Sequence, residues 1–416
     1  MREGYRMTTR PHIVILGAGY GGLCAAYRLQ KKLQPGQAMI TLVDRNGYHV
    51  NKISLHEVAL GNALSQDISY DLVPVVRQPH ARVLKAEVLS IDRKNQLVHT
   101  SEEDLAYDYL VIALGFVPET FGIQGMAENA FQIENLAQSE AIARHIEDCF
   151  RRYAFADAAD RDPLDLAILV GGSGFTGTEL LGEIGDRVPL LCKKYGIDQS
   201  LVSIRCVSAD HQFLPMFSPK EAQEVMDYLV SCGISFYMDA MIHEATPKSF
   251  RFKDENGDHE FKANTLIWTG GVSGSPLMKE TFGDAVKRGR LIVNSDLTAP
   301  GYDNIYVLGD CAAFISKGKD RPEPTTAQIA TQMGYHAADN IVRTILRRPR
   351  HAFVYRYRGT VCSLGARHGL ADLKGRTVKG FLAMRLKLFI ESVTDYKVSG
   401  LYNAIKHTRL FKLFNF

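Results

Sequence analysis

Residues 11–22, which read PHIVILGAGYGG, constrain the fold of this chain more than any other stretch. The apolar run at 13–16 leads directly into Gly17-x-Gly19-x-x-Gly22, and apolar residues at helical spacing follow. Strand, glycine turn and helix in that order form the dinucleotide-binding fingerprint. Gly17 permits the tight turn, Gly19 lets a pyrophosphate approach the backbone, and Gly22 lets the helix pack closely on the strand. The sequence therefore predicts a dinucleotide site with its phosphates at a helix N-terminus.

An acidic residue is expected to end the second strand of such a unit and to bind a ribose hydroxyl, about 20 residues after the last glycine. The apolar segment 39–43 ends at Asp44, which stands 22 residues after Gly22. The alternative is a glycine-rich turn without a ligand, and the strand, helix and acid around the turn disfavour it.

A second strand, glycine turn and helix begin at residue 166. Here the apolar run 166–170 leads into Gly172-x-Gly174-x-x-Gly177. Each fingerprint alone has a sizeable false-positive rate, so two in one chain strengthen the interpretation. The chain is therefore expected to be an α/β protein with two Rossmann-like dinucleotide-binding domains.

The second unit lacks the expected acid. After the predicted strand at 202–207, Ser208 occupies the position of the ribose-binding carboxylate, and Asp210 follows two residues later. A carboxylate there favours the 2′-hydroxyl of NAD, whereas its absence removes the repulsion against the 2′-phosphate of NADP. NAD is the expected nucleotide, and NADP is left open.

Composition excludes several other classes. A length of 416 residues predicts two or three domains, and a formal net charge of +3 is too small to indicate nucleic-acid binding. The seven cysteines show no C-x-x-C pair and no metal-ligand spacing, so reduced thiols in a cytosolic setting and no metal are expected. No apolar run reaches 18 residues, and the N-terminus lacks the apolar core of a signal peptide.

Further strands are predicted between and after the two fingerprints. They cover residues 81–90, 96–100, 107–115, 265–269 and 304–308. The last strand ends in Gly309-Asp310, and a purely structural role for Asp310 would be to cap a following helix. The polar and aromatic segment 46–61 has no clean periodicity and is expected to pack beside the first cofactor.

A helix is predicted from Ala327, after the proline-rich break at 322–326. Gln328 and Gln332 are four residues apart and therefore share one face of this helix. From spacing alone, a solvated face remains the more ordinary explanation for two glutamines.

The C-terminal segment has a different character. Leu382, Leu386, Phe389 and Val393 form an apolar helical stripe. Seven basic residues accompany it against only two acidic ones: Lys379, Arg385, Lys387, Lys397, Lys406, Arg409 and Lys412. This pattern predicts a helix in a membrane interface beside anionic lipid, and the alternative is a helix packed on its own protein or on a twin subunit.

With these features in view, the chain resembles the type II NADH dehydrogenases, single-chain flavoprotein NADH:quinone oxidoreductases with two dinucleotide-binding domains. The resemblance covers nearly the whole chain. It is carried by ILGAGYGG (15–22), DYLVIALG (108–115), VGGSGFTGTELLGE (170–183), LIWTGGVSGSPL (266–277), NIYVLGDCA (304–312), PTTAQIATQ (324–332) and YRGTVCSLG (357–365). The glycine motifs are shared with all relatives, whereas GFTGTE, WTGGV, AQIATQ and the basic tail together are more specific.

The resemblance implies three parts: an FAD-binding domain at 8–125 and 280–345, an NAD(P)H-binding domain at 126–279, and a C-terminal membrane-anchoring region at 346–416. It implies that FAD is held without a covalent bond by residues of the first turn, of the strand ends and of the helix at 327. These are Gly17, Ala18, Gly19, Tyr20, Gly21, Gly22, Asp44, Arg45, Val88, Ala113, Gly115, Asp310, Ala327 and Gln328.

The resemblance further implies that NADH binds at the second turn, through Gly172, Gly174, Gly177, Ser208, Gly270 and Gly271. Catalytic positions carried over are Glu179, between nicotinamide and flavin, and Gln328 with Gln332, at the quinone-side face of the flavin. Glu179 would orient the nicotinamide or relay protons if burial raises its pKa, or would merely belong to the helix after the turn.

The implied reaction is the transfer of two electrons from NADH through FAD to menaquinone or ubiquinone, at the cytoplasmic face of the cell membrane. A homodimer is left open. Departures from the family pattern are Ser208, Met333 in place of a more polar residue, and Thr325 in place of a second proline. They put nicotinamide choice and the detail of the quinone pocket in question.

Rival functions follow from the same fold. A disulfide reductase or a sulfide:quinone oxidoreductase needs cysteines against the flavin, and no cysteine occurs between Asp44 and Cys149. Cys149, Cys311 and Cys362 are the candidates that such chemistry would have to use. A flavin- or NAD-binding redox sensor, or an NADPH-preferring paralogue with weak turnover, is the other alternative.

Overall fold

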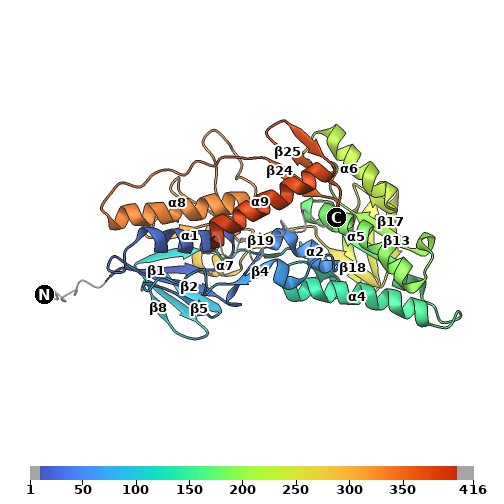
Figure 1. The fold of residues 1–416 in the computed structure, drawn as a ribbon, viewed down its shortest axis with the longest axis horizontal. Coiled ribbons are helices and arrows are strands. Elements are labelled where there is room, and N and C mark those ends of the chain that lie inside the picture. Colours follow the sequence, from blue (N-terminus) through green and yellow to red (C-terminus); the bar gives the residue numbers. More distant parts are fainter. Residues whose placement is uncertain (1–9, 401–416) are drawn as a thin grey trace.

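The computed structural model describes residues 10–400 and has an α/β fold built around two five-stranded parallel sheets. The first sheet and its helices occupy one half of the elongated molecule, and the second sheet occupies the other half (Figure 1). The fold class expected from the two fingerprints is confirmed.

The first sheet has the order β22-β9-β1-β2-β5, and all of its neighbouring strands are parallel. Its strands are β1 (His12–Leu16), β2 (Met39–Asp44), β5 (Ala81–Lys85), β9 (Tyr109–Ile112) and β22 (Ile305–Val307). Two helices lie on one face, α1 (Tyr20–Lys32) and α8 (Ala327–Ile345). The central strands are fully buried because helices and loops cover both faces, which explains their continuous apolar runs.

The second sheet repeats this plan with the order β11-β18-β12-β13-β14. Its strands are β11 (Phe131–Gln132), β12 (Ala167–Gly171), β13 (Ser203–Val207), β14 (Ile234–Tyr237) and β18 (Thr265–Trp268). The flanking helices are α4 (Leu136–Phe155), α5 (Phe175–Tyr195) and α6 (Pro219–Ser231). In both halves the glycine turn joins the central strand to the helix that leads on to the neighbouring strand, as the two fingerprints predicted.

Smaller elements connect and cover the two halves. Strands β10 (Phe116–Pro118) and β19 (Val272–Gly274) pair with each other, and so do β3 (Tyr48–Val50) and β4 (Ser69–Asp71). Within residues 10–400, three sheets are antiparallel and have three strands each. The first contains β6 (Val88–Asp92), β7 (Leu97–Thr100) and β8 (Leu105–Ala106), and the second contains β15 (Met241–Thr246), β16 (Ser249–Asp254) and β17 (Gly257–Lys262). The third contains β24 (Thr360–Ser363), β25 (Gly369–Asp372) and β26 (Thr377–Lys379). A mixed sheet joins β20 (Val286–Lys287), β21 (Arg290–Ile292) and β23 (Ala312–Ala313). Short helices are α2 (Leu55–Ala59), α3 (Met126–Asn129) and α7 (Leu277–Phe282).

The single strand predicted over residues 81–90 is wrong, because the structure divides it. The strand β5 pairs with β2 at the edge of the first sheet, and the chain then turns at residues 86–87 so that β6 joins a separate antiparallel sheet. The Ala86 N–H donates to the Asp44 backbone carbonyl (3.1 Å), which extends the pairing by one bond before the turn. Neither glycine nor proline occurs in residues 81–90, so the sequence carried no turn signal for this break.

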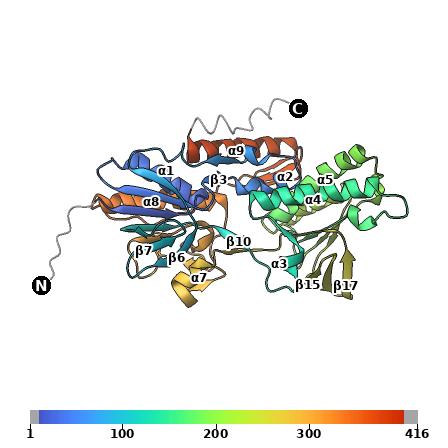
Figure 2. The ribbon, with the colours of Figure 1, turned by 90° about the horizontal axis from the view of Figure 1, so that it is seen from below.

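The C-terminal helix α9 (Phe381–Ser399) crosses from α1 to the β24–β25 hairpin, and Figure 2 shows it on the outside of the molecule. Half of its predicted apolar stripe faces outward, since Leu382 is 68% exposed and Phe389 is 57% exposed, whereas Leu386 and Val393 are half-buried. The charged side chains Lys387 and Glu391 point inward and are buried. This polarity is the reverse of an ordinary surface helix, which buries its apolar face.

The predicted basic and aromatic tail beyond Gly400, with Lys406, Arg409 and Lys412, lies outside the described residues. Over residues 10–400 no helix combines the length and the apolarity that a bilayer-spanning segment requires.

Close packing of α1 on α8 depends on Gly334, where an added Cβ would overlap the carbonyl oxygen of Gly21. Replacing Gly334 by Ala gains about 1 kcal/mol of helix propensity, but overpacking against backbone costs about 1–3 kcal/mol. We expect Gly334→Ala to lower the thermal unfolding midpoint of the purified protein. The exposed loop residue Gly36, where a Cβ meets nothing within 4 Å, provides the control variant Gly36→Ala. Equal midpoints for the two variants would contradict this packing account.

Candidate active site

Both glycine turns have the geometry that their fingerprints require. Gly17 has φ +91° and Gly172 has φ +101°, a backbone region that side chains other than glycine rarely adopt. A Cβ on Gly22 would overlap the carbonyl of Gly17, and one on Gly177 would overlap the carbonyl of Gly172. Helix and strand therefore approach each other as closely in the second unit as in the first.

The middle glycine of each turn faces open space. A Cβ on Gly19 or on Gly174 would meet nothing within 4 Å, and these two residues are the N-caps of α1 and α5. Both caps are glycines, so no cap side chain accepts from the first N–H groups, and neither helix has an acid in its first turn. Uncapped N–H groups beside empty space fit a bound diphosphate at each helix end.

The residue at the end of the second strand differs between the two units, but its side chain accepts equivalent backbone hydrogen bonds in both. Asp44 accepts hydrogen bonds from the N–H of Ala18 (3.0 Å) and of Asn46 (2.8 Å). At the equivalent place, the Ser208 hydroxyl accepts from the N–H of Ser173 (3.3 Å) and of Asp210 (3.3 Å). Ser208 thus takes over the backbone contacts of the missing acid, and its hydroxyl also donates to the Asp210 carboxylate (3.1 Å).

A cavity of about 1840 Å³ extends from the first glycine turn to α9. Single-ligand pockets usually measure about 300–1,000 Å³, so this one has room for more than one ligand. It is lined by predicted site residues of both units: Gly17, Ala18, Gly19, Tyr20, Gly21, Asp44, Arg45, Val88, Ala113, Gly115, Glu179, Asp310, Ala327, Gln328 and Gln332. Gly22, Gly172, Gly174, Gly177, Ser208, Gly270 and Gly271 do not line it.

The excluded residues form a second, neighbouring group. Gly172 packs directly against Gly270, since a Cβ on Gly172 would lie 2.7 Å from the Gly270 Cα. The cavity touches this group only through residues of the following helix and strand, Phe175, Thr176 and Val272. The second glycine turn therefore lies beside the large cavity and borders it through α5 and β19.

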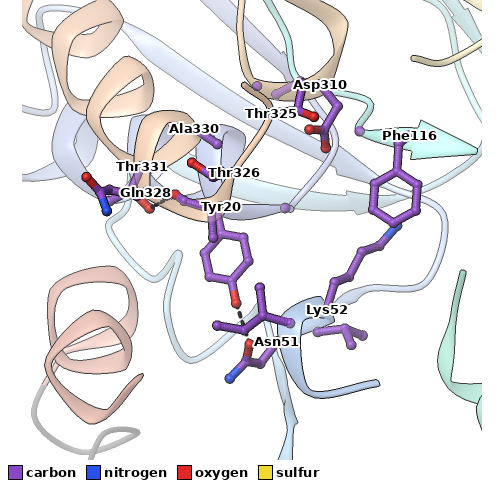
Figure 3. A pocket seen from close by; sticks show the side chains of 18 of the residues that line it. Tyr20, Asn51, Lys52, Phe116, Asp310, Thr325, Thr326, Gln328, Ala330 and Thr331 are labelled. Atoms are coloured by element: carbon purple, nitrogen blue, oxygen red, sulfur yellow. Dashed lines mark hydrogen bonds between the residues drawn. The ribbon is translucent and has the colours of Figure 1, made fainter. Parts of the chain in front are cut away.

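Asp310 and Lys52 face the same part of the cavity (Figure 3). Burial raises the pKa of Asp310 against the opposing effect of the Lys52 and Arg290 charges, and burial lowers the pKa of Lys52. Asp310 lies in a short 3₁₀ turn (Gly309–Cys311) and does not cap a helix, so the purely structural role considered for it is not observed. Most residues between Asn46 and His56 also contribute to the cavity wall.

Glu179 is buried at the junction between the two units. Its Oε1 accepts from the Ser363 N–H (3.0 Å), the Ser363 hydroxyl (2.8 Å) and the Lys387 Nζ (3.0 Å). Burial alone would raise the pKa of this carboxyl, but Lys387, His56 and the bonds from Ser363 lower it overall. The raised pKa considered from sequence is therefore wrong, and Glu179 is ionised at neutral pH.

Sequence reasoning missed the role of Lys387, which it counted among the lipid-facing basic residues of the tail. Lys387 is only 6% exposed, and its Nζ binds Glu179 and the Ser363 hydroxyl (2.6 Å). A signal was present, because Lys387 and Glu391 are four residues apart on the face opposite Leu382 and Phe389. The partner on α5, 208 positions earlier, is a tertiary contact that spacing does not reveal.

Gln328 and Gln332 hold down the segment at 355–359. The Gln332 amide accepts from the Arg356 N–H and donates to the Arg356 carbonyl (both 3.1 Å). The Gln328 amide accepts from the Arg358 N–H (2.8 Å) and donates to the Gly359 carbonyl (3.2 Å). Both glutamine side chains are therefore hydrogen-bonded to the backbone of this segment. They hold residues 355–359, the strap, against α8, where the strap forms part of the cavity wall.

The structure shows the surroundings of Met333 and Thr325, two of the residues that depart from the family pattern. Met333 is buried, and its sulfur accepts a hydrogen bond from the Gly309 N–H (3.4 Å) beneath the Asp310 turn. It therefore supports the first nucleotide site and does not line the cavity. Thr325 lines the cavity beside Thr326, whose hydroxyl caps α8 (Figure 3).

The cysteines that a sulfide- or disulfide-based mechanism needs are absent from the cavity wall over the described residues. Cys149, Cys311 and Cys362 are fully buried, and burial raises the pKa of each thiol, to about 12 for Cys311. A buried thiol with a raised pKa supplies little of the thiolate nucleophile. The geometry therefore disfavours both rival chemistries.

Comparison with known proteins agrees with this geometry. Residues 11–334 match the family model described as pyridine nucleotide-disulphide oxidoreductase. A curated type II NADH:quinone oxidoreductase of Staphylococcus saprophyticus is 44% identical over 95% of this chain and 98% of its own length, and the Staphylococcus aureus protein of that name is 43% identical over the same shares. Among solved structures, NDH2 from Plasmodium falciparum in complex with NADH superposes with a TM-score of 0.86 at 17% identity, over 97% of this chain and 98% of that one. The chain belongs to the type II NADH:quinone oxidoreductase family.

Proposed function

We propose that the protein transfers two electrons from NADH to a membrane quinone through non-covalently bound FAD. The observation that carries this proposal is the single cavity that joins the first glycine turn, the end of the second nucleotide site at Glu179, and the apolar helix α9. Electron donor, carrier and acceptor can meet in one enclosed space only if these three features are continuous. The names of the curated relatives, at about the same length, support the same reaction.

The residues of the first site fit FAD. The open Gly19 turn would hold the diphosphate, Asp44 a ribose and Asp310 the ribityl chain, while Val88 and Arg45 would border the adenosine end. When bound, the flavin supplies the chemistry of accepting two electrons from a nicotinamide and passing them on. We assign residues 8–125 with 280–345 to this domain, 126–279 to NADH binding, and 346–416 to the membrane-facing region.

Side chains and backbone groups of the protein would bind the nicotinamide nucleotide and transfer protons. The second glycine turn would bind the NADH diphosphate, which directs its reactive end towards Glu179. The ionised Glu179 and the Lys387 ammonium form a buried pair at the point where the second site meets the cavity. A positioned acid–base pair of this kind can pass a proton to a quinone oxygen as electrons arrive.

The exposed apolar face of α9 supports attachment to the cytoplasmic face of the cell membrane as a peripheral protein. Leu386, Phe389, Ile390 and Val393 line the cavity from this helix, so a quinone leaving the lipid would meet apolar side chains on its way in. The cavity wall does not distinguish menaquinone from ubiquinone, and the exposed face would serve lipid better than a homodimer because a basic tail follows it.

The proposed function predicts a yellow protein with two separable half-reactions. Acid extraction is expected to release FAD, identified by chromatography, and anaerobic NADH is expected to bleach its visible absorbance. Addition of a short-chain quinone is then expected to restore the absorbance with one quinone consumed per NADH. A colourless preparation, or bleaching without recovery on adding quinone, would refute the proposal.

Nicotinamide choice is expected to depend on Asp210. Ser208 is buried by its backbone contacts, so the exposed Asp210 carboxylate is the charge nearest to the place of a ribose 2′ group, and no Lys or Arg occurs between residues 208 and 219. We expect NADH to be preferred over NADPH, and Asp210→Asn to lower the ratio of their kcat/KM values by about tenfold, because one repulsive charge is removed. Asp258→Asn, an exposed acid on β17, is the control. An NADPH preference in the wild type would contradict this assignment.

Membrane attachment is tested by making the outward face of α9 polar without touching Lys387. Phe381 and Leu382 are exposed and do not line the cavity. The double variant Phe381→Asn, Leu382→Asn is expected to lose flotation with anionic phospholipid vesicles while it still reduces a water-soluble quinone. Phe155→Asn, at an even more exposed apolar residue on α4, should float as the wild type does. Undiminished flotation of the double variant would argue against the α9 surface.

A further inference from the structure

Glu183 is a buried carboxyl group that the mechanism above leaves without a role. It lies on α5 four residues after Glu179, so the two side chains share one face of the helix one turn apart. Glu183 is 3% exposed, and its Oε2 accepts a hydrogen bond from the amide of Asn62. Among the described residues no lysine or arginine forms an ion pair with it. An isolated buried carboxylate is costly, and such groups usually stay neutral or serve a function.

The groups around Glu183 come from several elements. Glu57 on α2, Lys387 on α9 and Asp186 on α5 itself act electrostatically on Glu183, and His56 and Lys387 also contact Glu179. Lys387 is already bonded to Glu179 and Ser363. Asp186 accepts from the Ala366 N–H, and Arg187 is paired with Glu147 on α4. Burial first, and then the charge of Glu57, raise the pKa of Glu183 to about 8. Burial and the neighbouring Glu57 thus favour the protonated form of Glu183, whereas the contacts of Glu179 favour its ionised form.

The proposed reaction has a proton requirement that this group fits. NADH delivers two electrons together with one proton, whereas a quinol contains two electrons and two protons more than the quinone. One proton per turnover must therefore come from the medium and reach a buried site. Glu57 and Asn62 are half-buried, and the Asn62 amide donates a hydrogen bond to Glu183, so Asn62 links Glu183 to partly exposed residues.

We propose, on the basis of the proposed function, that Glu183 stores the medium-derived proton and supplies it to the Glu179–Lys387 pair during quinone reduction. As the quinone receives its electrons, the pair gives one proton to a quinone oxygen. The O–H bond of Glu183 then breaks and its proton restores the pair. Glu183 regains a proton from water through the Glu57 and Asn62 side, so charge and protons balance in each cycle.

The test separates the two half-reactions of the FAD-loaded enzyme by anaerobic stopped-flow absorbance. We expect Glu183→Gln, which keeps the shape and the Asn62 contact, to be bleached by NADH at the wild-type rate. Its recovery with a short-chain quinone is expected to slow by at least about tenfold, at the low end of general acid–base effects. Glu147→Gln, at a surface ion pair on α4, should recover normally. The infrared carbonyl band of a protonated carboxyl, which titrates near pH 8 in the wild type, should be missing in Glu183→Gln.

A second variant keeps the inference testable if Glu183→Gln does not fold. Removal of the Glu57 charge lowers the pKa of Glu183, so in Glu57→Gln the alkaline decline of quinone reduction should begin at lower pH than in the wild type. Wild-type recovery rates in Glu183→Gln, or an unmoved pH profile in Glu57→Gln, would overturn the role of Glu183 alone. Failure of the wild type itself to bleach with NADH or to recover with quinone would overturn the proposed function.

Discussion

The bond between Lys387 and Glu179 determines how the last helix sits on the rest of the molecule. Two charges removed from water are costly, and loss of one partner from such a buried pair costs about 3–5 kcal/mol. Ser363 on β24 provides additional hydrogen bonds to both charged groups: its N–H and hydroxyl donate to Glu179, and its hydroxyl oxygen accepts from Lys387. Once Lys387 points inward, helical geometry obliges Leu382 and Phe389 to point outward. The apolar surface of α9 is thus a consequence of its buried charges.

This arrangement gives one helix two tasks. Its inward side closes the cavity beside Glu179, and its outward side presents an apolar strip that water solvates poorly. A lipid-soluble substrate therefore has a path along one element, from an apolar surface to the proposed flavin site, without crossing bulk water. The strap at 355–359, fixed by Gln328 and Gln332, closes the neighbouring wall. Cutting α9 away would remove the active-site lysine together with the apolar strip, which is why substitution of its exposed face isolates attachment from catalysis.

The sequence predicted those features that depend on residues close together in the chain. The strands ending at Leu16 and Gly171, the glycine turns and the helices after them follow from a few neighbouring residues, and the structure has them all. The break between β5 and β6 was not predicted, because the pairing partner of each half lies elsewhere in the chain. The same holds for Lys387 and for the glutamines, whose partners are distant carboxylate and backbone groups. Spacing predicted an apolar stripe on α9, of which Leu382 and Phe389 are exposed, but not the charged residues buried beneath it.

The two halves of the molecule show how one scaffold carries different chemistry. Asp44 and Ser208 make the same two backbone hydrogen bonds, so the fold at the end of the second strand tolerates either residue. Only the charge at the strand end differs: Asp44 is itself a carboxylate, whereas the Ser208 hydroxyl is neutral and donates to the carboxylate of Asp210. Because the backbone contacts are already satisfied by a hydroxyl, the choice of nucleotide at the second site is separated from the stability of the turn. The acid there is free to vary while the strand, the turn and the helix are kept.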